Sequence, residues 1–172
     1  RCWLLILPIA GHAQAPVWLW ATGFTGSSDV QMRDIASSSE NGCFALGSFS
    51  PNLYLPFDTL ASAGGAGTYF VAHVDTLGAV TWAAQFSDRA ASMHGLPNDG
   101  LSCLIPFVGS TMVNGQAVTA TTSGHAALVV ELDNTGSITS MISIALTQWP
   151  AVTSPTRIVH HTEGSGIVLA DT

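Results

Sequence analysis

The chain resembles itself at a fixed spacing of 58 residues, and this internal repeat constrains its fold more than any other feature. The matching positions follow one another without a gap: Asn41 and Gly42 with Asp99 and Gly100, Leu46 with Leu104, Phe49 with Phe107, Asp75 with Asp133, and Gly78 with Gly136. Repeats of this length are units that cannot bury their apolar faces alone and therefore stack on one another. We expect an array of similar units.

Partial copies lie on both sides of the two full ones. A third copy begins near Arg157, because Arg33, Ile35 and Gly42 match Arg157, Val159 and Gly166 at a spacing of 124 residues. The second interval is therefore 66 residues, with an eight-residue insertion between Gln148 and Pro155. Before the first copy, Trp20 and Ala21 resemble Trp82 and Ala83. We expect the end of one unit, two whole units and the start of another.

Each unit is predicted to contain four short strands. In the first unit these are Arg33–Ser37, Cys43–Phe49, Tyr69–Val74 and Ala79–Phe86, with a Gly-rich loop at 63–67 before the third. In the second unit, Leu128–Leu132 and Ser137–Ser143 correspond to the last two. Asn41-Gly42 is a strong hairpin signal, because both residues tolerate a positive φ. Strands that are apolar on both faces belong in stacked sheets.

The two Asp-to-Gly turns allow a second interpretation. Asp75–Gly78 and Asp133–Gly136 each begin with Asp and end with Gly, as a calcium loop could. The EF-hand pattern needs alternating oxygen ligands and a distal Glu, which neither segment has. An Asp side chain that hydrogen-bonds the backbone two residues on is the favoured interpretation.

The N-terminus has the pattern of an export signal. Arg1 precedes the apolar run Cys2–Ala10, and Ala13, Gln14 and Ala15 form an A-x-A cleavage site. We predict that residues 1–15 are a signal peptide, the alternative being a buried strand. No other stretch approaches the roughly 20 apolar residues of a membrane span. Because the chain lacks an initiating Met, we expect a fragment of a longer, exported protein.

Composition agrees with an extracellular β protein and excludes several functions. Charged residues make up only 9% of the chain and apolar residues 47%, with 17 Gly, which indicates short strands and frequent turns. The chain contains no Lys, so Schiff-base chemistry is excluded. A net charge of −7 disfavours nucleic acid and anionic membranes as partners.

The chain resembles the repeats of bacterial secreted β-propellers that are often called SBBP repeats. The likeness covers Val17–Phe86 well and Ala91–Ser143 loosely, the second unit having Ser140 where the repeat has Trp. The residues that carry it are Asp34-Ile35-Ala36, Asn41-Gly42, Gly47-Ser48-Phe49, Phe70-Val71-Ala72, Asp75, Gly78 and Trp82-Ala83.

This resemblance implies a fold and a location. The expected fold is all-β, an incomplete β-propeller of four-stranded antiparallel blades, with about two and a half blades in this chain and about seven in a whole ring. The blades would span about 33–90 and 91–148, with the third beginning near 157. The resemblance also implies export to the bacterial exterior or cell surface, often with C-terminal sorting or adhesion modules. It carries over no catalytic residues.

Two histidines are the candidate metal ligands. His94 and His160 share the repeat position held by Ala36, on the first strand of each unit, which is the innermost strand of a propeller blade. Two imidazoles converging on the central channel could bind a divalent metal or an anion. His161 would face the opposite way, so it cannot chelate together with His160 from one strand. Unrelated surface or packed histidines are the alternative, and no cofactor is predicted.

Other chemistry-bearing residues leave alternatives open. Cys43 and Cys103 could form a disulfide or remain buried free thiols. The tryptophans at 18, 20, 82 and 149 could stack sugars, although packing between blades is the favoured interpretation. No pair of carboxylates suited to glycoside cleavage is indicated, and Gly47-Ser48-Phe49-Ser50-Pro51 breaks the nucleophile-elbow pattern at its last position.

We therefore predict a non-catalytic secreted or cell-surface scaffold that binds an extracellular protein or glycan. The alternative is a propeller enzyme acting on polysaccharide at the central channel, for which His94, His160 and an acid should lie within about 5 Å of one another. A spacer without a ligand is a third possibility.

Overall fold

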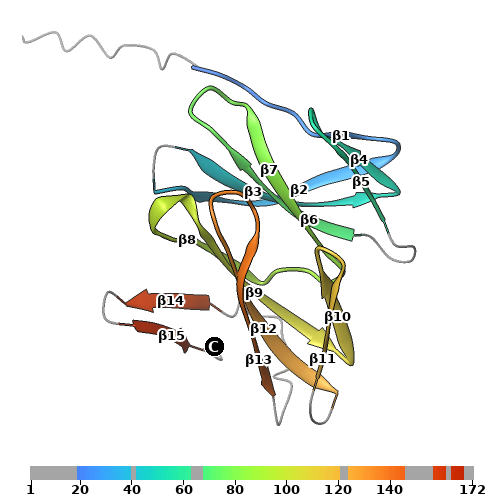
Figure 1. The fold of residues 1–172 in the computed structure, drawn as a ribbon. Helices are drawn as coiled ribbons and strands as arrows, with labels where there is room; N and C mark the ends of the chain where they lie inside the picture. The colour runs from blue at the N-terminus through green and yellow to red at the C-terminus, as the bar shows by residue number, and fades with distance from the viewer. Residues whose placement is uncertain are drawn as a thin grey trace, which may run out of the picture.

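The computed structural model of the chain is all-β, with antiparallel sheets of which none is closed (Figure 1). It describes residues 19–39, 42–62, 68–120, 124–145, 157–161 and 164–168, the last two ranges by their backbone. The predicted signal peptide, residues 1–15, lies outside these ranges.

The first unit supplies four strands of a six-stranded sheet, which we call the first sheet. They are β2 (Asp29–Ser37), β3 (Cys43–Ser50), β6 (Thr68–Val74) and β7 (Val80–Phe86), and they pair in chain order. The other two strands, β10 (Ser110–Val113) and β11 (Gln116–Thr119), are a hairpin of the second unit. Val113 of β10 pairs with Phe86 of β7, so one unit extends the sheet of the other.

The second unit forms a separate four-stranded sheet, which we call the second sheet. Its strands are β8 (Ser92–Gly95), β9 (Leu101–Val108), β12 (His125–Leu132) and β13 (Ile138–Ala145), again paired in chain order. A single 3-10 turn, η1 (Pro97–Asp99), connects β8 to β9. Each strand overlaps the segment 58 residues after its counterpart in the first sheet, so the sequence repeat is also a structural one.

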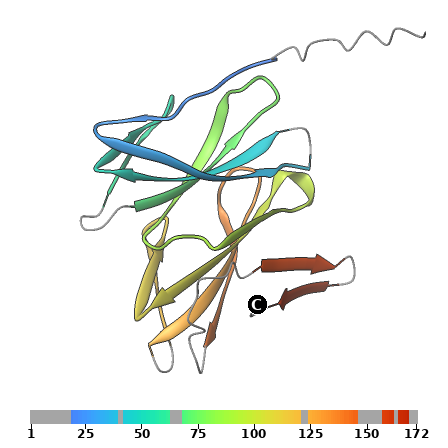
Figure 2. The same cartoon turned by 180° about the vertical axis from the view of Figure 1, so that it is seen from behind.

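Two smaller sheets flank these. β1 (Thr25–Gly26), β4 (Asn52–Tyr54) and β5 (Thr59–Ala61) form a three-stranded sheet. β14 (Arg157–His161) and β15 (Gly164–Val168) form a two-stranded hairpin. Strand β8 contacts β2 on one side and β14 on the other, so the first strands of successive copies lie next to one another (Figures 1 and 2).

The core lies between the first and second sheets, which pack face to face. Alternate residues of a strand face opposite sides, so each apolar strand of the first sheet supplies one set of side chains to this core and another to the three-stranded sheet. The largest buried side chains between the two main sheets are Phe44, Val71, Phe86, Leu101, Ile105, Phe107, Leu128 and Leu132. Stacking of units is thus what buries the apolar faces.

Most predicted strands are confirmed, and one feature of each unit is new. The predicted segments of β2, β3, β6, β7, β12 and β13 agree with the structure to within a few residues, except that β2 begins at Asp29 and β12 at His125. Each unit also has a hairpin between its second and third strands, β4–β5 in the first and β10–β11 in the second. Strands of three or four residues are too short for a periodic pattern to predict.

A tryptophan packed on a glycine joins one unit to the next. Trp82 of β7 is only 5% exposed, and a Cβ on Gly136 would lie 2.8 Å from its ring. In the same way, a Cβ on Gly78 would lie 3.0 Å from the ring of Trp20. Both glycines have a positive φ, +82° at Gly78 and +79° at Gly136. The interpretation of these two tryptophans as packing residues is confirmed, and Trp18 and Trp149 lie outside the described residues.

We predict that Gly136→Ala destabilises the chain more than Gly115→Ala does. Both glycines have φ of +79°, so both substitutions carry the same backbone cost of about 1–2 kcal/mol, but only position 136 is blocked by Trp82. Overpacking should add about 1–3 kcal/mol for Gly136→Ala, measured by urea unfolding. Equal destabilisation of the two variants would show that the Trp82 contact does not restrict position 136.

Candidate functional site

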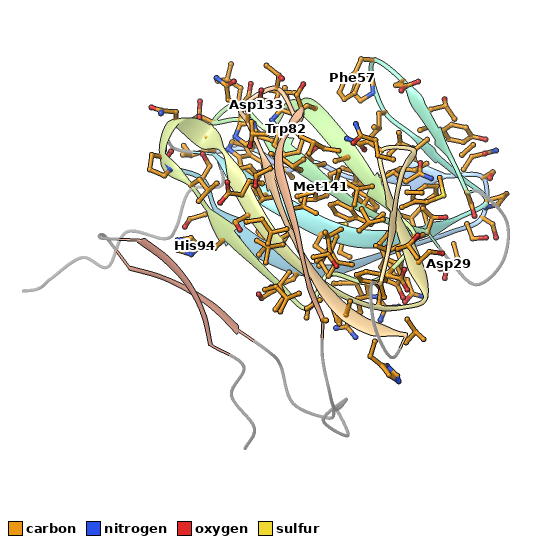
Figure 3. The ribbon with its side chains drawn as sticks, turned by 60° about the horizontal axis from the view of Figure 1, so that its bottom comes forward. Asp29, Phe57, Trp82, His94, Asp133 and Met141 are labelled. Carbon is orange, nitrogen blue, oxygen red and sulfur yellow. The ribbon has the colours of Figure 1, made fainter. Side chains whose placement is uncertain are left out.

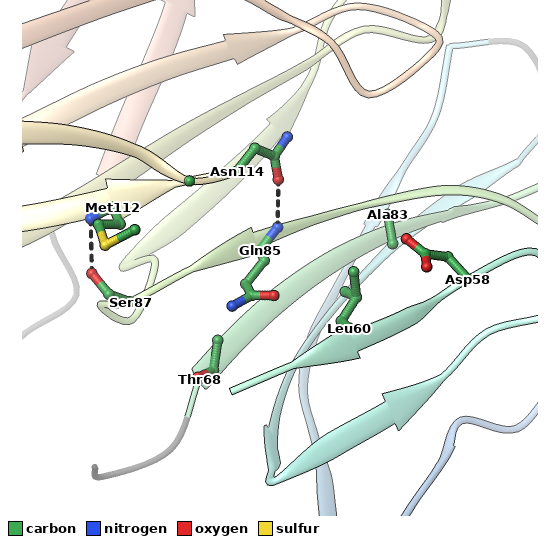
Figure 4. A pocket seen from close by; sticks show the side chains of 9 residues that line it. Asp58, Leu60, Thr68, Ala83, Gln85, Ser87, Met112 and Asn114 are labelled. Atoms are coloured by element: carbon green, nitrogen blue, oxygen red, sulfur yellow. Dashed lines mark hydrogen bonds between the residues drawn. The ribbon is translucent and has the colours of Figure 1, made fainter. Parts of the chain in front are cut away.

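A pocket lined by both polar and apolar side chains lies where the two units meet, beside the end of β7 (Figure 4). Its volume is about 430 Å³. The first unit contributes residues from β5, β6, β7 and the loop before β5, and the second unit contributes the tip of the β10–β11 hairpin. The lining residues are Asp58, Leu60, Thr68, Ala83, Gln85, Ser87, Met112, Asn114 and Gly115.

Asn114 positions the hairpin tip on β7. Asn114 and Gly115 both have positive φ, 47° and 79°, which a two-residue hairpin turn requires. The backbone N–H of Gln85 donates to Oδ1 of Asn114 at 2.8 Å (Figure 4). The N–H of Asn114 donates to the carbonyl of Gln85 at 2.9 Å. These two bonds extend the pairing between β7 and β10 and fix this wall of the pocket.

Further hydrogen bonds hold the remaining polar walls. The N–H of Met112 donates to Oγ of Ser87 at 2.8 Å, and the hydroxyls of Ser87 and Thr111 lie 3.1 Å apart. On the other side, Nε2 of Gln85 donates to the carbonyl of Ala61 at 3.0 Å. The pocket is therefore built from amides and hydroxyls held in place by the fold, with the Asp58 carboxylate and the apolar side chains of Leu60 and Ala83 beside them.

Sequence reasoning missed this pocket, although one signal for it was present. Asn114-Gly115 is the same dipeptide as Asn41-Gly42, and it predicts a hairpin turn on its own. The neighbouring strands are four residues each, so this turn alone reveals the hairpin. Its attachment to β7 of the preceding unit depends on tertiary packing and has no local signal.

The two candidate histidines lie on neighbouring strands. His94 is on β8 with an exposed side chain, and His160 is on β14, which contacts β8 (Figure 3). The side chains of His160 and His161, and the whole of Glu163, lie outside the described residues. Within the part of the chain whose side chains are described, no group of three His, Cys, Asp or Glu residues could hold a metal ion. The metal site thus stays a prediction.

The two Asp-initiated turns have the geometry of backbone caps. Oδ1 of Asp75 accepts hydrogen bonds from the N–H groups of Leu77 and Ala79, both at 2.8 Å. Oδ1 of Asp133 accepts the equivalent bonds from Thr135 at 2.8 Å and Ser137 at 3.0 Å. Both carboxylates are thus engaged with their own turn, which confirms the turn interpretation over the calcium loop. Figure 3 shows Asp133 beside Trp82, at the contact between the units.

Both described cysteines are free thiols. Cys103 is buried in the core between the two sheets, and burial raises the pKa of its thiol to about 12. Cys43 is half-buried, and burial also raises the pKa of its thiol. Of the two alternatives left open by the sequence, the structure has the free thiols.

Comparisons with protein-family models, with curated proteins and with solved structures found no match. The resemblance to secreted propeller repeats therefore stays a prediction. In the described ranges, no helix has the length and apolar character needed to cross a membrane.

We predict that the stabilising effect of Asp133 disappears at acid pH. Hydrogen bonds from the Thr135 hydroxyl and from the N–H groups of Thr135 and Ser137 lower the pKa of this carboxyl. The ionised form therefore stabilises the folded chain above the ordinary Asp range, and this contribution is lost as the pH falls through the lowered pKa. The difference in Tm between wild type and Asp133→Asn should be largest near neutral pH and shrink on acidification. A difference that does not change with pH would contradict this.

We also predict that iodoacetamide modifies Cys43 before Cys103 in the folded protein. The thiolate is the reactive species, and Cys103 combines full burial with a pKa of about 12. Peptide mass spectrometry after timed labelling should find Cys103 modified only in denaturant. Equal labelling of both residues under native conditions would show that the core around Cys103 opens readily.

Proposed function

We propose that this chain is part of a non-catalytic, secreted or cell-surface β-propeller scaffold that binds an extracellular glycan or protein. In this proposal each unit is one four-stranded blade. The observation that carries it is the repeated contact between units, a tryptophan of one unit packed on a turn glycine of the next. A contact of this kind can be repeated with every added unit, as an array requires.

Three features of the sheets support the propeller arrangement. The four strands of each unit pair in chain order, the sheets of the two units pack face to face, and the first strands of successive copies are neighbours. Radial repetition of four-stranded sheets produces all three features together. Export is supported by the signal-like pattern of residues 1–15.

The pocket supports a role in binding a neutral, hydroxyl-rich ligand. Its polar lining consists of two amides and two hydroxyls, which donate and accept hydrogen bonds without carrying charge, plus the single carboxylate of Asp58. Neutral oligosaccharides present complementary hydroxyl groups, and Leu60 and Ala83 offer apolar contact for the sugar ring. We therefore favour a glycan over a protein as the ligand of this pocket.

The test is a binding measurement on matched carboxylate variants. Protein collected from the culture medium, expected to begin at Pro16, is applied to an array of neutral oligosaccharides. Asp58→Asn should weaken binding to the recognised glycan by about 10-fold or more, because it replaces a charged acceptor with a neutral amide. Asp29→Asn, a similar change at an exposed position of β2 outside the pocket, should leave binding unchanged.

Any one of three results would overturn the proposal. Retention of the protein in the cytoplasm with residues 1–15 intact would contradict export. Binding that responds equally to Asp58→Asn and Asp29→Asn, or the absence of binding to any oligosaccharide, would contradict the glycan pocket.

A further inference from the structure

The segment 19–26, at the start of the described chain, lies where the last strand of a preceding unit would lie. Its Trp20 packs on the turn glycine Gly78, as Trp82 of β7 packs on Gly136. Strand β1, at the end of the segment, pairs with the β4–β5 hairpin, as β7 pairs with the β10–β11 hairpin. The first unit therefore has the same kind of contact on both of its sides.

A pair of hydrogen bonds through a serine repeats at the same two places. The N–H of Ser27 donates to the carbonyl of Asn52 at 3.1 Å, and the N–H of Asn52 donates to Oγ of Ser27 at 3.2 Å. Where β7 meets β10, Ser87 and Met112 make the same two bonds, at 3.0 and 2.8 Å. The segment 19–26 is thus related to the β4–β5 hairpin as β7 is related to β10–β11.

The other edge of this segment differs from that of β7. Strand β7 pairs there with β6, the third strand of its own unit. Strand β1 is at the end of its three-stranded sheet, so nothing in the described part of the chain pairs with its other edge. Residues 19–24 form no strand, although the ring of Phe24 packs on Phe70 with centroids 5.2 Å apart. The segment is therefore held in the place of a fourth strand without the third strand beside it.

The backbone N–H groups of Phe24 and Gly26 are directed to this open edge. In a strand, the N–H groups of successive residues point alternately to its two sides. Ser27 donates its N–H to the carbonyl of Asn52, at the start of β4, so the N–H groups of Gly26 and Phe24 point away from β4. A row of unpaired N–H and C=O groups at a sheet edge is a template for a further strand.

The residues before the segment do not have the sequence of the missing strand. When Trp20 is aligned with Trp82, residues 6–12 take the place of β6 and residues 13–16 take the place of the Asp-to-Gly turn. Residues 13–16 contain neither Asp nor Gly, and Pro8 lies within 6–12, where a central strand does not tolerate proline. The missing strand is therefore expected from another part of the polypeptide or from another molecule.

We propose that the open edge of segment 19–26 binds the third strand of a later repeat unit of the same polypeptide. This segment then becomes the fourth strand of that unit. The proposal rests on the proposed function, in which the chain is part of a propeller and the secreted protein begins at Pro16.

The repeated contact between units favours a later unit over a second molecule. A head-to-tail contact that recurs with a closing rotation produces a ring, and a ring brings the last unit beside the first. A unit of the same polypeptide also has a high effective concentration at this edge. The strand that fits resembles β6, which buries side chains on both of its faces.

Amide hydrogen exchange of the secreted full-length protein, resolved residue by residue, tests the proposal. The amides of Phe24 and Gly26 should exchange at least about 100-fold more slowly than unpaired backbone. The amide of Ser27, which already donates to Asn52, should be protected in either case and is the internal control. Rapid exchange at Phe24 and Gly26 beside a protected Ser27 would overturn the proposal.

Thr22→Pro and Ala21→Pro are a matched pair of variants for the same edge. Both side chains are exposed, and the alternation directs the N–H of Thr22 to the open edge and that of Ala21 to the opposite side. Because proline removes the N–H, Thr22→Pro should lower the Tm of the full-length protein by at least about 2 °C. Ala21→Pro should leave the Tm unchanged, and equal values for the two variants would contradict strand pairing at this edge.

The same exchange measurement distinguishes the other occupants of the edge. Protection that rises with protein concentration would assign the edge to a second copy of the chain. Protection found only in protein that retains residues 1–15 would assign it to the N-terminus of the same chain. Either result would overturn the proposal. Absence of glycan binding, by contrast, would contradict the proposed function and leave the protection of Phe24 and Gly26 unchanged.

Discussion

The face-to-face packing of the two main sheets is the interaction on which everything else in this structure depends. The middle strands of a unit, such as β3 and β6, bury side chains on both faces. A sheet of this kind cannot be stable with both of its faces in water. Packing the next unit against this sheet buries one of its faces. The far face of that next unit is then uncovered in its turn and requires a further unit. The contact of Trp82 with Gly136 sets how close two units come, because only a residue without a side chain fits beneath the ring.

Much of the fold could be predicted from the repeat, but the physical reason for one pair of repeated glycines differs from the expected one. Gly42 was expected to take a positive φ in its turn, but neither Gly42 nor its repeat partner Gly100 does. The φ of Gly100 is −78°, and the positive values in that turn belong to Asn98 and Asp99. A Cβ on Gly100 would lie 3.0 Å from the carbonyl oxygen of Leu132, so glycine is required there by close approach of two strands. The local sequence indicated a turn that contains glycine. It could not show that glycine is needed for the close approach of another strand, because that strand lies 32 residues further along the chain.

The candidate sites were less predictable than the strands. The repeat identified His94, but the register that pairs it with Ser102 of β9 follows only from the fold. The pocket lies between a hairpin and the preceding unit, so no stretch of sequence contains it. Both sites are combinations of distant segments, and single-sequence patterns describe only the segments.

The hairpin β10–β11 belongs to the second unit and completes the sheet of the first. This shared sheet affects how duplication or exchange of units can alter the protein. The pocket it forms is assembled from two halves, one from each neighbour, so the number of pockets is set by the boundaries between units. Exchanging or duplicating one unit would alter two boundaries at once. Recombination at the 58-residue period could therefore produce new binding surfaces from existing halves without any new mutation.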